Sequence, residues 1–196
     1  MSKASVKKVL LAMTKKDIIE MVLEMYSARK EVKEYLEFYA SPNENGKLEE
    51  YKAIIKEEFY PKRRREPQTR FSVCRKAVAD FKKLKPSPDA LAELMVSYME
   101  WATKLTFDYG DMWEPYNDSV ESNFNKTIKH IVLNGLWDKY NDRLQQCVIW
   151  SEGNGYGFAD AIADMYEEGK AIDKDLATKY PTTRMSETEI KKMFGK

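Results

Sequence analysis

The chain has 196 residues, of which 43% are hydrophobic and 33% charged, and its formal net charge is +1. This length and composition suit a folded domain with its own core, and twelve Tyr, eight Phe and four Trp argue against intrinsic disorder. No uninterrupted run of eighteen apolar residues occurs, so we expect neither a membrane-spanning helix nor a membrane partner. Because Cys74 and Cys147 lie far apart and no cleavable leader is recognisable, we expect a cytoplasmic protein.

Apolar residues recur at helical spacing from the N-terminal region onward. The rows that begin at Ile18 and Ile19 meet at Tyr26. The polar face is formed by Lys16, Asp17, Glu20, Glu24 and Ser27. The next row runs from Val32 to Tyr39 and ends at the turn-forming residues 41–46. Another row, from Leu48 to Phe59, ends at Pro61. Each of these segments predicts an amphipathic helix.

The second half of the chain continues this pattern, with each row bounded by proline or glycine. Ser87 is placed to cap a helix that has Pro88 at its first position and Gly110 at its end. The remaining rows are Phe71 to Phe81, Tyr116 to Ile131, Trp137 to Cys147, and Phe158 to Tyr166. Asn134-Gly135 and the stretch from Gly153 to Gly157 are the breaks between the last three rows.

The fold class that follows is all-α. We predict about nine amphipathic helices, arranged as antiparallel hairpins in an irregular bundle or a short solenoid-like array, because most connections are short. Residues 1–169 are predicted to form a single helical domain. Residues 170–196 are predicted to be a polar tail, with a short helix from the capping box of Ser186 and Glu189 to about Phe194.

Charge is unevenly distributed along the chain. Residues 62–85 hold ten basic and two acidic side chains, whereas residues 86–169 hold five basic and fifteen acidic ones. Arginine and lysine on a turn and the following helix suit contacts with phosphate or with an acidic partner. The candidate binding residues are Lys62, Arg63, Arg64, Arg65, Arg70, Arg75 and Lys76.

Two interpretations of this basic segment stay open. The first is that its charge is compensated by the acidic half of the same chain, residues 86–169. The second is that it binds the phosphates of a nucleic acid. A small DNA-binding helix pair near the N-terminus is a weaker alternative, because residues 1–61 carry equal numbers of acidic and basic side chains.

Patterns for metals, cofactors and catalysis are missing from the sequence. One histidine, His130, and two separated cysteines cannot form a zinc or di-iron site, so we expect no metal and no cofactor. Residues 153–157 are rich in glycine but follow no strand and precede no Lys-Ser or Lys-Thr pair, which favours a turn over a phosphate-binding loop. No catalytic residue can be singled out.

Three segments resemble an uncharacterised bacterial family of domains of unknown function. They are the turn Pro61-Lys62-Arg63-Arg64-Arg65 with the helix that begins near Phe71, the stretch from Met13 to Glu20, and the stretch from Glu31 to Tyr35. The resemblance covers about residues 5 to 168 and implies an all-helical bacterial protein without an assigned activity.

The leading functional hypothesis from the sequence is a non-enzymatic helical module that binds another protein through a charged face or groove. Nucleic-acid binding through residues 62–85 is the alternative.

Overall fold

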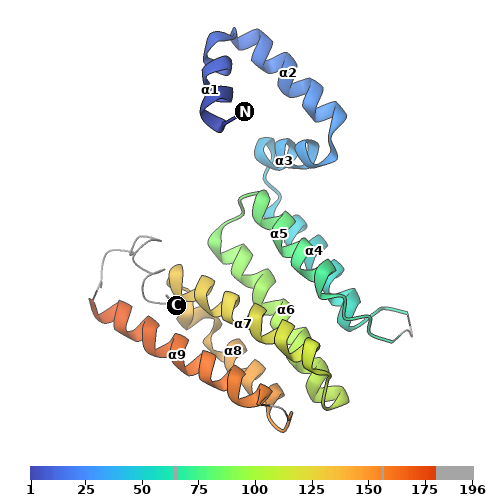
Figure 1. Ribbon diagram of the computed structural model, residues 1–196, viewed down its shortest axis with the longest axis vertical. Coiled ribbons are helices and arrows are strands. Elements are labelled where there is room, and N and C mark those ends of the chain that lie inside the picture. Colours follow the sequence, from blue (N-terminus) through green and yellow to red (C-terminus); the bar gives the residue numbers. More distant parts are fainter. Residues whose placement is uncertain (64–65, 156, 180–196) are drawn as a thin grey trace. The chain divides into compact units, whose positions relative to one another are not determined.

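The computed structural model describes residues 1–63, 66–155 and 157–179, and within them the fold is all-α, as predicted (Figure 1). The predicted short helix between Ser186 and Phe194 lies outside the described residues. The helices of the described residues are α1 (Lys3–Ala12), α2 (Lys15–Ala28), α3 (Lys30–Ala40), α4 (Glu44–Phe59), α5 (Phe71–Lys83), α6 (Pro88–Tyr109), α7 (Glu114–Leu133), α8 (Trp137–Ser151) and α9 (Phe158–Lys179).

The ends of α6 confirm the capping signals in the sequence. The Oγ of Ser87 accepts a hydrogen bond from the backbone N–H of Ala90 at 3.1 Å, and Pro88 is the first residue of the helix. Gly110 follows the last residue with a φ of +85°, a conformation that a side chain with a Cβ disfavours. These local signals fix both ends of α6.

Two glycines behave differently from the sequence prediction. Gly46 was expected in a turn but lies inside α4, which begins at Glu44. Gly169 lies inside α9, which continues to Lys179, so the expected domain boundary at residue 169 does not coincide with a helix end. A Cβ on Gly169 would lie 2.4 Å from Cγ2 of Ile128 and 3.0 Å from the ring of Trp137. Glycine is therefore present to let α9 approach its neighbours closely.

The chain divides by its internal contacts into two compact units, residues 1–44 and the part from Asn45 onward. In the second unit α6 packs against α5, α7 and α8, and α9 packs against α7 and α8 (Figure 1). The rings of Phe59, at the end of α4, and Tyr98, on α6, lie 5.8 Å apart, and both side chains are buried. None of the described helices is long and apolar enough to span a membrane.

Candidate functional site

A groove of about 780 Å³ lies between α5, α6 and α7. Helices α5 and α7 both pack against α6 but not closely against each other, and this leaves a trough above one face of α6. The residues that line the groove are Arg75, Val78, Ala79, Lys82, Leu91, Met95, Tyr98, Asn123, Lys126, Thr127, Lys129, His130, Leu133 and Asn134.

The groove has an apolar floor between basic walls. Leu91, Met95 and Tyr98 follow one another at helical spacing along α6 and provide the floor. Arg75 and Lys82 come from α5, while α7 supplies the other two cations, Lys126 and Lys129. No Asp or Glu is found among the described residues that line it. The groove is therefore suited to a molecule that has both anionic groups and apolar surface.

Polar side chains at the floor are held by hydrogen bonds within the fold. The Nδ2 of Asn123 donates to the backbone oxygen of Ser119 at 2.6 Å and lies 3.5 Å from the hydroxyl of Tyr98. Burial raises the pKa of Tyr98, so the phenol stays neutral. Thr127 donates to the backbone oxygen of Asn123 at 2.9 Å. These bonds fix the positions of Asn123 and Thr127 on the α7 wall, next to Tyr98 of the floor.

His130 contributes a fixed imidazole to the α7 wall. Its Nε2 donates to the backbone oxygen of Pro88 at 2.9 Å, because a carbonyl oxygen can only accept. The Nδ2 of Asn134 donates to the backbone oxygen of His130 at 2.7 Å and lies 3.3 Å from its Nδ1. Burial lowers the pKa of His130, and the nearby charge of Lys82 lowers it further, against the opposing hydrogen bond to Pro88. Both ring nitrogens therefore contact other groups of the fold, and the lowered pKa keeps the ring neutral at neutral pH.

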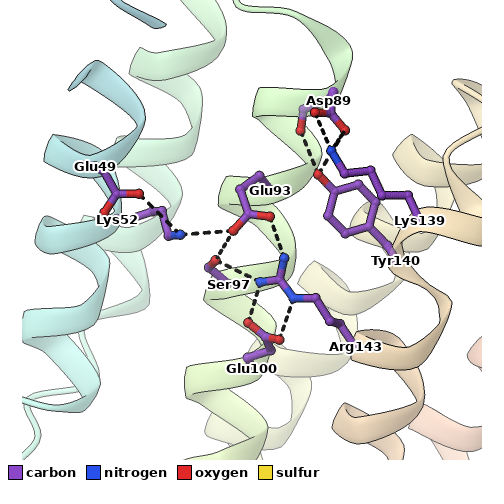
Figure 2. Close-up of polar contacts among 9 residues, drawn as sticks. All are labelled: Glu49, Lys52, Asp89, Glu93, Ser97, Glu100, Lys139, Tyr140 and Arg143. Carbon is purple, nitrogen blue, oxygen red and sulfur yellow. Dashed lines mark hydrogen bonds and ion pairs between the residues drawn. The ribbon is translucent and has the colours of Figure 1, made fainter. Parts of the chain in front are cut away.

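The opposite face of α6 carries a second polar cluster (Figure 2). The guanidinium of Arg143, from α8, contacts Glu93, Ser97 and Glu100, which lie on α6 about half a helical turn away from the groove floor. The Nζ of Lys52, from α4, lies 3.0 Å from the carboxylate of Glu93. Three helices are thereby joined by one set of ion pairs.

The groups in this second cluster already bind one another. Burial by itself would raise the pKa of Glu93, but the hydrogen bonds from Arg143 and Lys52 outweigh it and the pKa is lowered. The hydrogen bonds from Arg143 to Glu100 and Glu93 raise the pKa of the guanidinium despite its burial. We interpret the cluster as structural, because its charges are matched within the fold.

A neighbouring pair extends the contacts between α6 and α8 (Figure 2). The Nζ of Lys139 lies 2.7 Å from both carboxylate oxygens of Asp89, and the hydroxyl of Tyr140 donates to the same residue at 3.1 Å. Three carboxylates of the acidic half, those of Asp89, Glu93 and Glu100, are thus paired with cations of the same half, Lys139 and Arg143.

Arg70, one of the candidate residues from the sequence, is engaged within the fold. Its Nε and Nη2 donate to the two carboxylate oxygens of Glu58 at 2.9 and 2.6 Å, and its backbone N–H donates to the same side chain at 3.1 Å. The hydrogen bonds from Arg70 lower the pKa of Glu58, which is buried. The pair closes the connection between α4 and α5.

The other candidate residues are distributed over different surroundings. Lys76 pairs with Asp80 one turn further along α5, and Lys83 lies 2.7 Å from the same carboxylate. Lys62 and Arg63 are exposed in the connection after α4, whereas Arg64 and Arg65 lie outside the described residues. Of the five candidates that the structure describes, Arg75 is the one that lines the groove.

These pairs bear on the interpretation that the basic segment is compensated by residues 86–169. Arg70, Lys76 and Lys83 pair with Glu58 and Asp80, which both lie outside that acidic half. The partners come from α4 and from the basic segment itself.

The cations of the α7 wall, Lys126 and Lys129, are not among the residues predicted from the sequence. Lys126 and Lys129 are spaced three residues apart, which places them on one side of a helix, and that spacing was the available signal. The charge summed over residues 86–169 is strongly acidic and obscures these two lysines. Within the described part of the chain, no three His, Cys, Asp or Glu side chains come together as a metal site would require.

Comparison with known proteins identifies a family. The sequence profile of DUF6155, a family of unknown function, matches residues 1–153. No curated protein and no solved structure matches the chain. Nothing in these comparisons favours nucleic-acid binding. The match confirms the resemblance to an uncharacterised family, and the chain belongs to DUF6155.

Proposed function

We propose that this protein is a non-enzymatic helical module that binds an acidic segment of a partner protein in the groove between α5, α6 and α7. The observation that carries the proposal is the combination of four cations from two walls with an apolar floor, and with no carboxylate among the described lining residues. A partner segment that presents carboxylates beside apolar side chains matches both features.

The dimensions of the groove support a protein segment as the occupant. Leu91 and Tyr98 are seven residues apart, so the floor follows α6 for about 10 Å, roughly two helical turns. A volume of about 780 Å³ accommodates a few side chains of a bound segment. The cations on both walls would meet acidic residues on both edges of that segment.

A binding role rather than a catalytic one is supported by the state of His130. Proton transfer needs a ring nitrogen that is free to reach a substrate, and both nitrogens are engaged by Pro88 and Asn134. We also propose a cytoplasmic location, which the buried free thiols of Cys74 and Cys147 support.

Photo-crosslinking in the native host tests this proposal. A photoreactive amino acid replaces Ala79, an exposed residue of the groove wall, and in a matched control it replaces Ala171, an exposed residue of α9. We expect a protein adduct from position 79 and none from position 171. Mass spectrometry of the adduct should identify an acidic peptide that also contains apolar residues.

Charge reversal then links the adduct to the groove. Lys82→Glu with Lys126→Glu changes one cation on each wall and should abolish the adduct, whereas Lys174→Glu, on exposed surface of α9, should leave it unchanged. An adduct that survives the double reversal, or one that carries nucleic acid, contradicts the proposal.

A further inference from the structure

Residues 1–44 form helices without forming a core. Among α1, α2 and α3 no residue is buried. Several large apolar side chains are instead exposed, among them Val9, Leu11 and Leu23, with 58%, 77% and 57% of their surface accessible. Short helices gain most of their stability from packing an apolar face, so this unit needs another surface to cover it.

The apolar residues form stripes on two helices. On α1, Val6, Val9 and Leu10 follow the i, i+3, i+4 pattern, and on α2 the exposed pair Ile19 and Leu23 lies one turn apart. Helix α2 packs against α3, whereas α1 has no comparable packing against either helix within residues 1–44, all of which the structure describes. The stripe on α1 is therefore left uncovered by the other helices of residues 1–44.

Charge identifies which partner fits. Residues 1–16 hold five lysines and no acidic side chain, whereas residues 17–44 hold seven acidic and three basic ones. Lys3 and Lys7 lie along one edge of the α1 stripe, and Glu20 and Glu24 lie along one edge of the Ile19–Leu23 pair. Residues 1–44 therefore carry a basic edge and an acidic edge and are nearly neutral in total. Such a surface matches a second copy of itself better than a strongly charged partner.

We propose that residues 1–44 are a self-association element, in which α1 of one copy packs over the Ile19–Leu23 edge of α2 of a second copy. Twofold symmetry repeats the contact, so each copy gives its α1 and receives the other α1. The two helices of each copy then complete a four-helix arrangement with an apolar interior. This inference is independent of the groove and of its proposed partner.

Paired charge reversals in the full chain test this arrangement. One variant carries Lys3→Glu and Lys7→Glu, and the other carries Glu20→Lys and Glu24→Lys; all four residues are exposed. In light scattering after size-exclusion chromatography, the wild type should show twice the 22.9 kDa mass of one chain. The dissociation constant of each variant alone should be at least about tenfold higher, because like charges then meet at both of the symmetry-related contacts.

Mixing the two variants is the decisive step. In the mixed dimer both contacts again pair lysine with glutamate, so the dimer mass should return. A monomeric wild type at about 100 μM, where even weak dimers are populated, overturns the inference. The four substitutions can also be combined in one chain. If that chain behaves like the wild type while the mixture of the two variants stays monomeric, the contact lies within one chain and the inference is overturned. Circular dichroism of each variant checks that its helices are retained.

Discussion

The guanidinium of Arg143 forms a two-point contact with the carboxylate of Glu100, Nε to Oε1 at 2.7 Å and Nη2 to Oε2 at 2.6 Å (Figure 2). The parallel arrangement fixes α8 on α6 in both distance and rotation, because a planar fork meets a planar carboxylate in few ways. The remaining guanidinium nitrogen contacts Glu93.

Replacing Arg143 with alanine should destabilise the protein by about 2–4 kcal/mol, since the partly buried carboxylate of Glu100 loses its cation and that of Glu93 keeps Lys52 alone. Arg143→Lys retains the charge without the fork and should lose less. Urea unfolding followed by circular dichroism measures both variants. The matched control is Lys139→Ala, which removes a more exposed pair and should change the free energy of unfolding by less than about 1 kcal/mol. Equal losses for Arg143→Ala and Lys139→Ala would show that the Arg143 cluster has no special role.

Gly169→Ala should destabilise the protein by about 1–3 kcal/mol, although alanine favours helix by about 1 kcal/mol over glycine. The added methyl group would overlap Cγ2 of Ile128 and press on the Trp137 ring. Thermal and urea unfolding measure the loss. Combining it with Ile128→Leu, which removes the branched methyl group, should recover part of the loss, and a net stabilisation by Gly169→Ala alone contradicts the close packing of α9.

Acidification should destabilise the fold through His130, the single histidine of the chain. Its pKa in the folded protein is lowered from the ordinary 6.5, mainly by burial, so the unfolded state takes up the proton first. The stabilising contribution is complete above pH 6.5 and is lost as the pH falls below that value, with a slope of at most about 1.4 kcal/mol per pH unit.

The test of this dependence compares urea midpoints at about pH 7.5 and 5.5, above the range in which most carboxylates titrate. The wild type should lose stability between them, and His130→Gln should lose much less. If the two proteins respond equally, His130 is not the group responsible.

The two thiols should be unreactive in the native protein. Burial raises the pKa of both Cys74 and Cys147 to about 12, so almost no thiolate exists at pH 8. A thiol reagent such as dithiobis-nitrobenzoate should react slowly, at the rate at which the fold opens, and should react at once with both thiols in concentrated urea. Rapid modification of either cysteine without denaturant would falsify its assignment to the core.

The helices could be predicted well because their signals are local. Ser87 and Pro88 start α6, Gly110 ends it, and the apolar spacing between them identifies the buried face. Gly169 shows where local reasoning fails, since its role depends on Ile128 and Trp137, which are more than thirty residues away in sequence.

The groove was not predictable in the same way. Arg75 stood out because other basic residues surround it in sequence, whereas Lys126 and Lys129 are two of only five basic side chains in residues 86–169, which hold fifteen acidic ones. Their common surroundings arise only when α5 and α7 pack on the same helix. The net charge of a segment therefore pointed to the cations of the α5 wall and concealed those of the α7 wall.

The position of α6 has a consequence for hydrogen exchange and for recognition. Since α5, α7 and α8 all pack on it, its amides should be among the slowest to exchange in the protein, and the floor of the groove belongs to that slowly opening part. A partner segment would meet a surface that is already ordered, so the entropy lost on binding would fall on the partner and on the long side chains of the walls.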